Sequence, residues 1–150
     1  MSSTDKCGVC QKHQDLKSLP GGVIFENDAL FIAHFPLLEN QPNPYFGHII
    51  IELKRHITRP SELNENEAKY LGIWIQKISA ALENILNAEH VYIFRIGDKT
   101  PHLHFHIVPR YANTPKEVWG TGIYEWPMAR RAQTRELIEI SDGLRKFLCH

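Results

Sequence analysis

The 150-residue sequence predicts an α+β fold, in which an antiparallel sheet of about five strands carries one long helix and a C-terminal helix. Two observations predict this class. Apolar segments of strand length, rich in β-branched and aromatic residues, are separated by short turn signals. Among them lies one segment whose apolar residues recur every three or four positions, the period of an α-helix. The length suits a single domain over residues 1–150, with its core over about 7–110 and an added aromatic loop and helix over 111–150.

The first half of the sheet is expected from three strands. Residues 23–25 and 29–35 are expected to form a hairpin around an acidic turn. Residues 46–56 form the third strand, and their near-continuous apolar centre is typical of a strand in the middle of a sheet. The proline-rich segment 36–45 is interpreted as a loop that borders a ligand cleft.

Two helices are expected, over about 65–87 and 134–148. Asn64 and Glu67 have the spacing of a helix N-cap with a reciprocating carboxylate three residues later. An apolar stripe follows, which predicts a long amphipathic helix that packs across the sheet. Its members are Ala68, Leu71, Ile75, Ile78, Leu82 and Ile85.

Residues 91–96 form the fourth expected strand, which the turn 97–100 connects to a fifth. Pro101 and Pro109 bracket this fifth strand. Because proline fits strand ends and edges but not central ladder positions, the strand is expected to stop near Val108.

The fifth strand carries three histidines at alternate positions. A strand sends alternate side chains to opposite faces, so His102, His104 and His106 share one face while the residues between them face the core. With ordinary pKa values of about 6.5, neighbouring imidazoles can supply metal ligands, a nucleophile and proton donors near neutral pH. A histidine-rich exposed strand or a tag-like tract is the alternative. A tag is flanked by polar residues, whereas every intervening residue here is apolar, which favours a functional site.

Two of the three cysteines form the motif Cys7-Gly-Val-Cys10. Two thiolates at this spacing make half of a tetrahedral zinc site, which commonly takes two imidazoles from elsewhere. By spacing alone, His13 is a candidate third ligand. A thioredoxin-like redox pair ranks lower, because such a pair opens a helix after a strand and no strand is expected before Cys7. A loose thiol pair without a metal is the remaining alternative.

Charge and hydropathy restrict the expected partners and compartment. Lys+Arg and Asp+Glu are both 17, so no net field attracts nucleic acid or a membrane surface. No apolar run approaches the roughly 18 residues of a membrane-spanning helix, and no signal-peptide pattern is found. Together with cysteines spaced as in a metal site, these features indicate a cytoplasmic protein.

Three segments together resemble the histidine-triad (HIT) family of nucleotide-binding hydrolases and transferases. The strand His-Leu-His-Phe-His, followed after two residues by Pro-Arg, carries the family's central motif. Gly47-His48, an apolar run and Lys54-Arg55-His56 match its basic strand motif, and residues 23–35 match its opening hairpin. His48 is interpreted as a structural histidine at the strand start. The resemblance implies the HIT fold, a small-molecule nucleotide substrate and a homodimer with two nucleotide sites.

The resemblance also implies a role for each histidine of the triad. His104 corresponds to the family's nucleophile, which forms a covalent bond to phosphorus. His106 corresponds to a donor of hydrogen bonds to the non-bridging phosphate oxygens. In zinc-bearing members, the first triad histidine and the histidine closing the basic motif complete a structural zinc site. Carried onto this sequence, the four zinc ligands are Cys7, Cys10, His56 and His102.

Two positions depart from the family's pattern. At the end of the second strand the family usually carries an Asp or Asn that binds the ribose hydroxyls. Here the residues are His34-Phe35-Pro36, and His34 and Asn40 are the candidate replacements. The connection before the triad is shorter than the loop that contacts the phosphates in many members. Lys99 and Thr100 are the candidates for that contact, and a plain hairpin turn is the alternative.

The expected function is therefore a nucleotide phosphoramidase or dinucleoside polyphosphate hydrolase that works through a covalent nucleotidyl-histidine intermediate. Adenosine phosphoramidates, dinucleoside polyphosphates and nucleotide sugars are the candidate substrates. The alternative is a zinc-stabilised nucleotide-binding or adaptor domain with little or no turnover. The aromatic segment 111–128 is interpreted as a lid or a dimer contact.

Overall fold

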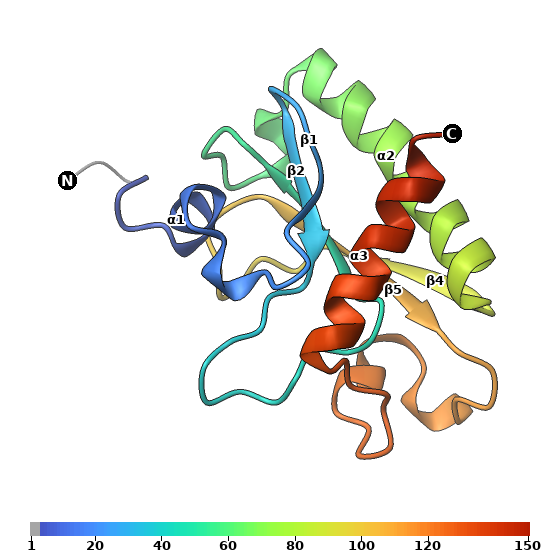
Figure 1. The fold of residues 1–150 in the computed structure, drawn as a ribbon. Coiled ribbons are helices and arrows are strands. Elements are labelled where there is room, and N and C mark those ends of the chain that lie inside the picture. Colours follow the sequence, from blue (N-terminus) through green and yellow to red (C-terminus); the bar gives the residue numbers. More distant parts are fainter. Residues whose placement is uncertain (1–3) are drawn as a thin grey trace.

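Five antiparallel strands form one sheet in the computed structural model, which describes residues 4–150 (Figure 1). They lie in the order β1-β2-β3-β5-β4. The strands are β1 (Val23–Glu26), β2 (Leu30–His34), β3 (Ile49–Leu53), β4 (His90–Phe94) and β5 (His104–Arg110). The α+β class with a five-stranded antiparallel sheet, expected from the sequence, is confirmed.

A side-chain oxygen sets the β1–β2 hairpin. Asn27 Oδ1 accepts hydrogen bonds from the backbone N–H groups of Ala29 (2.8 Å) and Leu30 (2.7 Å). Asparagine favours tight turns because its side chain can bond the backbone two residues ahead. β2 then pairs with β3 along its whole length, and every residue of β3 is buried, as expected for the middle of a sheet.

The long helix α2 (Glu65–Leu86) has clear signals at both ends. Asn64 Oδ1 accepts from the Glu67 N–H at 2.8 Å, and Glu67 Oε2 accepts from the Asn64 N–H at 3.0 Å, which closes a capping box. At the other end Asn87 has a φ of 51°, the left-handed conformation in which many helices end. The helix therefore matches the expected 65–87 to within one residue.

The main core lies between one face of the sheet and the two long helices, α2 and α3 (Thr134–Leu148) (Figure 1). Alternate residues of the strands point into it. Its members include Leu30, Ile32, Phe46, Ile49, Ile51, Leu53, Trp74, Ile78, Leu82, Leu103, Ile107, Leu137 and Leu144. The residues between them, such as Phe31, Ile50 and Glu52, face the other side of the sheet.

β5 differs from the prediction at both ends, because it begins at His104 and continues beyond Val108 to Arg110. The prediction failed because Pro109 lies where only one neighbouring strand remains. The Arg110 carbonyl accepts from the Glu89 N–H on the β4 side, so the nitrogen of the preceding proline points the other way, past the end of β3. At this position the missing N–H costs no ladder hydrogen bond.

A short helix, α1 (Gly8–Gln14), lies on the opposite face of the sheet from α2 and α3 (Figure 1). No pattern in the sequence predicts this helix. Helices shorter than about 12 residues are marginal in isolation, so the helicity of α1 depends on its contacts. Cys7 is its N-cap residue, and Cys10 follows in its first turn.

The segment between β5 and α3 folds back onto its own chain. Its two 3₁₀-helices are Lys116–Val118 and Gly120–Tyr124, and others lie at Leu16–Ser18 and Pro60–Glu62. Ile123 is fully buried in a second apolar cluster with Tyr45, Val108 and Ala129.

Within residues 4–150, no helix combines the length and hydropathy needed to cross a membrane.

Candidate active site and metal centre

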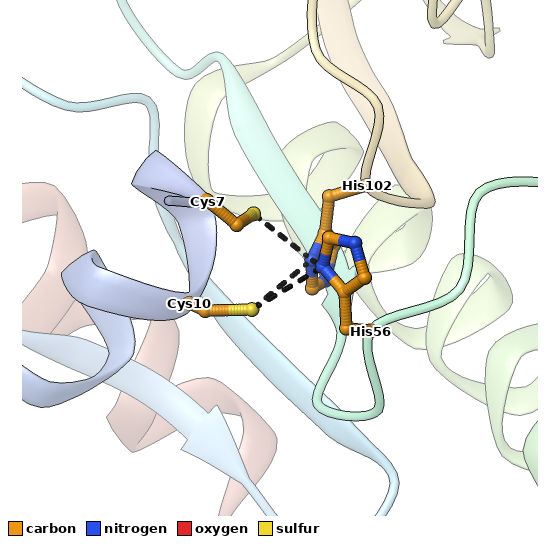
Figure 2. A group of neighbouring side chains, drawn as sticks. All are labelled: Cys7, Cys10, His56 and His102. Atoms are coloured by element: carbon orange, nitrogen blue, oxygen red, sulfur yellow. Dashed lines mark hydrogen bonds between the residues drawn. The ribbon is translucent and has the colours of Figure 1, made fainter. Parts of the chain in front are cut away.

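Four side chains that could hold a metal ion converge from three parts of the chain (Figure 2). Two come from the start of α1, one from the loop after β3 and one from the residues before β5. They are Cys7, Cys10, His56 and His102, and their ligand atoms all lie within 4.8 Å of one another. The structure thus brings together the four residues that the sequence analysis named as zinc ligands.

The distances within this group fit a tetrahedral ion. Zinc–sulfur bonds of about 2.3 Å and zinc–nitrogen bonds of about 2.0–2.1 Å place sulfur and nitrogen ligands about 3.5 Å apart and two nitrogens about 3.3 Å apart. The Sγ atoms of Cys7 and Cys10 each lie 3.5 Å from His102 Nδ1, and Cys10 Sγ lies 3.5 Å from His56 Nδ1. The two Nδ1 atoms are 3.3 Å apart. An ion of zinc's size fits between them.

The second ring nitrogen of His102 fixes which nitrogen faces this group. Nε2 lies 2.6 Å from the Leu53 carbonyl oxygen, so Nε2 donates its proton there and Nδ1 keeps its lone pair. Burial lowers the pKa of His102, which favours the neutral ring. A neutral imidazole in this tautomer is the form that binds a metal ion.

The thiols favour metal binding over redox exchange. Burial, together with the neighbouring Cys7 thiol, raises the pKa of Cys10 to about 11. Disulfide exchange requires a thiolate, and a thiol with this pKa supplies little of it near neutral pH. A bound cation, by contrast, displaces the thiol proton.

His13, the third ligand suggested by spacing alone, lies outside this group. Its Nε2 lies 2.8 Å from Glu52 Oε2, and its ring stacks on Phe31 with a centroid distance of 4.3 Å. Spacing in the sequence therefore suggested the wrong third ligand. The family resemblance pointed to His56 and His102, the two histidines that lie beside the thiols.

His104 has one ring nitrogen with a free lone pair. Its Nδ1 lies 2.6 Å from the carbonyl oxygen of His102, so Nδ1 carries the proton and donates it to that oxygen. Nε2 is then unprotonated, which is the state that a nucleophilic imidazole requires. The ring is half-buried, and its centroid lies 4.8 Å from that of His106 on the same face of β5.

A further histidine supports His106. His48 Nε2 and His106 Nδ1 are 2.8 Å apart, so one proton is shared between these two nitrogens. Burial lowers the pKa of His106 to about 4 and that of His48 well below 6.5, and both rings are neutral near pH 7. Phe35 stacks on His48 with a centroid distance of 4.5 Å. His48, interpreted from the sequence as structural, is thus in direct contact with the triad.

His34 is not available to bind a ribose, because the backbone uses both of its ring nitrogens. Nδ1 donates to the Phe35 carbonyl at 3.0 Å, and Nε2 accepts from the Gly47 N–H at 3.0 Å. Burial lowers its pKa to about 4. His34 is instead a structural link between the end of β2 and the start of β3. Asn40, the other candidate, lies in an exposed loop with a φ of 57°.

Lys99 and Thr100 lie in the bend that leads into the triad. Lys99 is exposed and Thr100 is half-buried. The Thr100 carbonyl accepts from the His102 N–H at 2.8 Å, so this turn helps to place the first triad histidine. Their side chains carry no hydrogen bond to another residue of the described range 4–150.

Glu52 is the main residue of this region that the sequence analysis missed. It is 2% exposed, lies opposite His104 in the β3–β5 register and faces the same side of the sheet. Its carboxylate accepts from Lys12 Nζ at 2.5 Å and contacts His13 at 2.8 Å. The sequence does carry a signal for Glu52, which lies inside an apolar strand. A buried acidic residue needs polar or charged partners.

The chain matches the family model of the HIT domain over residues 17–113. An uncharacterized HIT-like protein of Saccharolobus solfataricus is 28% identical to it over 126 residues, which are 79% of this chain and 81% of that protein. Because the family model covers well over half of the chain, the protein belongs to the histidine-triad (HIT) family.

Solved structures share the fold at low sequence identity. A zinc-bound histidine triad family protein from Mycobacterium smegmatis matches with a TM-score of 0.68 and 18% identity, covering 97% of this chain and 95% of that one. The diadenosine triphosphate hydrolase of Plasmodium falciparum matches with a TM-score of 0.59 and 15% identity, covering 85% and 76%. At these identities the likeness shows the fold alone.

Proposed function

We propose that this protein is a nucleotide hydrolase that cleaves phosphoanhydride or phosphoramidate bonds through a covalent nucleotidyl intermediate on His104. The observation that carries the proposal is the 2.6 Å contact of His104 Nδ1 with the His102 carbonyl, which leaves Nε2 unprotonated. Membership of the HIT family, and a shared fold with a diadenosine triphosphate hydrolase, support a nucleotide as the substrate.

In the first half-reaction, the His104 Nε2 lone pair attacks the phosphorus atom of the nucleotide. A phosphorus–nitrogen bond forms while the bond to the leaving group breaks, and the leaving group takes that electron pair. The ring gains positive charge in this step. The hydrogen bond from Nδ1–H to the His102 carbonyl stabilises that charge.

In the second half-reaction, the oxygen of a water molecule bonds to the phosphorus and the water loses a proton to solvent. The phosphorus–nitrogen bond breaks, which returns its electron pair to His104. His106 donates a hydrogen bond from Nε2–H to a non-bridging oxygen as negative charge develops there. For this to occur, the proton between His48 Nε2 and His106 Nδ1 must belong to His48. Because the pKa of His106 is about 4, His106 acts as a neutral donor.

We further propose that the four-residue cysteine–histidine group holds a structural zinc ion. Two thiolates and two imidazoles at tetrahedral distances favour zinc among the common metals. The four protein ligands fill a tetrahedral site and leave no position for substrate. When bound, the ion would therefore anchor α1 to the start of β5 rather than take part in the chemistry.

The intermediate provides the test of function. Wild-type protein mixed with a dinucleoside polyphosphate radiolabelled on the nucleotide and then denatured with detergent should retain label in an acid-labile, base-stable form. His104→Ala should retain none and should release nucleoside monophosphate several orders of magnitude more slowly, on the order of other nucleophile deletions. Nucleotide binding should survive, because the covalent contact is made in the transition state.

His106→Ala is the comparison variant, and it should cost less than His104→Ala because it removes one donor and keeps the covalent route. Normal turnover by His104→Ala would show that the nucleophile is elsewhere. Wild-type protein that binds nucleotide but neither retains label nor releases product would instead be a zinc-stabilised binding domain.

A further inference from the structure

A buried ionic cluster lies beside the triad and plays no part in the mechanism above. It consists of Glu52 on β3 and two residues of α1, Lys12 and His13. Glu52 Oε1 accepts from Lys12 Nζ at 2.5 Å, and Glu52 Oε2 lies 2.8 Å from His13 Nε2. The side chains are only 3%, 12% and 9% exposed for Glu52, Lys12 and His13. The Lys12 ammonium is therefore fixed rather than moving freely in solvent.

The register of the sheet places this cluster next to the nucleophile. Glu52 is the direct cross-strand partner of His104, and the neighbouring pair on the same face is Ile50 with His106. Directly opposite residues of an antiparallel pair have Cβ atoms about 4.5–5.5 Å apart. On the other side of β3, Phe31 pairs with Glu52 and carries the stacked ring of His13. α1 thus lies over the cross-strand row formed by Phe31, Glu52 and His104.

The Lys12 ammonium has donors to spare. A lysine ammonium carries three N–H groups. Among residues 4–150 its partner is one oxygen of Glu52. Its charge acts on the triad, because Lys12 contributes to lowering the pKa of His106 while Glu52 opposes that effect. Burial keeps the His106 ring neutral near pH 7, so this ring compensates little of a negative charge that binds beside it.

We propose that Lys12, held in place by Glu52, binds the phosphate chain of the leaving group, so that nucleotides whose leaving group is itself phosphorylated are the preferred substrates. This inference rests on the proposed function and removes adenosine phosphoramidates from its three substrate classes, because dinucleoside polyphosphates and nucleotide sugars both release a phosphorylated leaving group. Lys12 supplies a cation next to a triad whose preceding turn, 97–100, is short. Glu52 is a positioning residue that acts through Lys12.

The role follows from the charge change in the first half-reaction. When the bridging oxygen leaves phosphorus with its electron pair, negative charge increases on the departing phosphate. Two ammonium N–H groups can then donate to that phosphate, and donors aimed at developing charge act mainly in the transition state. An amine that leaves from a phosphoramidate carries no phosphate and gains nothing from Lys12.

The test compares two substrates that share the same nucleotide, diadenosine tetraphosphate and adenosine 5′-phosphoramidate. Lys12→Met should lower kcat/KM for the tetraphosphate about 10- to 100-fold, the range for losing a hydrogen bond to a charged group. For the phosphoramidate the change should stay within about threefold. Lys12→Arg, which keeps the charge, should recover part of the tetraphosphate activity. Lys17→Met is the matched control, because Lys17 lies on the same N-terminal segment with a 90% exposed side chain.

Glu52→Gln tests the positioning role. It should lower the ratio of tetraphosphate to phosphoramidate activity in the same direction as Lys12→Met, because the ammonium loses its fixed partner. Equal losses for both substrates in Lys12→Met, at unchanged melting temperature, would overturn the proposal, as would a loss of bound metal that accounts for the whole effect. In either case Lys12 would only dock α1.

A binding measurement separates this inference from the proposed function. If wild-type protein turns over neither substrate, the hydrolase proposal fails, and the affinities of AMP and ADP still test Lys12. Lys12→Met should then weaken ADP about tenfold or more relative to AMP, as expected for the loss of a charged hydrogen bond to the second phosphate. An unchanged ADP-to-AMP ratio would refute the role of Lys12 independently of catalysis.

Discussion

At the scale of single residues, backbone carbonyl groups decide the chemistry of two neighbouring histidines. The Leu53 carbonyl takes the Nε2 proton of His102, and the His102 carbonyl takes the Nδ1 proton of His104. The first ring therefore turns an unprotonated Nδ1 toward the cysteine–histidine group, and the second leaves Nε2 unprotonated for the attack on phosphorus that we propose. His102 and His104 therefore adopt opposite tautomers, because each ring donates its proton to the carbonyl group that it can reach.

Buried histidines should make the protein unstable in mild acid. Burial lowers the pKa of His34 and of His106 to about 4, so both stay neutral in the folded state while unfolded histidines take up protons below about 6.5. Because the unfolded state then binds more protons, the free energy of unfolding should be fully retained above pH 6.5 and should fall as the pH drops toward 4. Urea titrations at several pH values between 7 and 4.5 measure this fall.

His34→Gln isolates one contribution to this acid sensitivity. A glutamine oxygen can accept from the Gly47 N–H as His34 Nε2 does, but it cannot be protonated in this range. The change in unfolding free energy between pH 7 and pH 4.5 should become smaller by about 2–3 kcal/mol, which is what a pKa difference between about 4 and 6.5 provides. An equal pH dependence in the variant would contradict the assignment of His34.

At the scale of elements, α1 is a helix that owes its place to two sets of contacts. Its N-cap and first turn carry the two thiols of the cysteine–histidine group, and its second turn carries the two partners of Glu52. With seven residues it is too short to be stable in isolation. Metal binding and docking on the sheet should therefore depend on each other.

Removing one thiol should show this dependence. Protein purified without a histidine tag should contain about one zinc per chain, as a single four-ligand site requires. Cys10→Ser should release the metal and lower the melting temperature, because structural zinc contributes directly to folding. Elemental analysis and thermal denaturation measure both effects.

The third cysteine supplies the control for this experiment. Cys149 is exposed near the C-terminus, outside the cysteine–histidine group, and Cys149→Ser should leave metal content and melting temperature unchanged. Metal-free wild-type protein with the same stability as Cys10→Ser would rule out a structural metal.

The elements differ in how far the sequence could predict them. α2 and α3 follow from local periodicity and, for α2, from a capping box, and both ends of α3 were placed correctly. α1 has no such pattern, because its helical state depends on residues 39 to 95 positions away. The four ligands were found through a family motif, whereas the Lys12–Glu52 contact was missed because no local signal says which residues α1 will meet.

At the scale of the whole molecule, the sheet has the main core on one face and the candidate site on the other. α2 and α3 pack on one face, and the triad, α1 and the cysteine–histidine group lie on the other (Figure 1). Side-chain alternation along the triad strand predicted which side of that strand faces the core. That residues 1–150 act as one domain stays a prediction.

Homodimer formation also stays a prediction, and the exposed edge of the sheet offers a place for it. β4 is an edge strand, with Ile93 50% exposed and Ile96 58% exposed just beyond its end. The adjoining segment 111–128, which packs partly on its own chain, leaves Trp119 41% exposed. Exposed apolar edges of this kind favour pairing with another chain. Light scattering at micromolar concentration should give twice the mass of one chain.

Charge at this edge should break the dimer. Ile93→Lys should give a monomer, whereas Ile138→Lys, at a position of similar exposure (42%) on α3, should not. A monomeric wild-type protein would leave Trp119 to the role of a lid. A dimer that survives Ile93→Lys would place the contact elsewhere.

His102 takes part in both the cysteine–histidine group and the orientation of His104. Its imidazole belongs to the cysteine–histidine group, while its carbonyl holds the ring of His104. A replacement of His102 keeps the carbonyl group but removes the ring contacts with Leu53 and Cys7 that hold this part of the backbone, so we expect it to affect both the proposed metal site and the proposed chemistry at His104. A codon change at position 102 is therefore expected to affect both at once, whereas a change at His104 leaves the four side chains of the cysteine–histidine group in place.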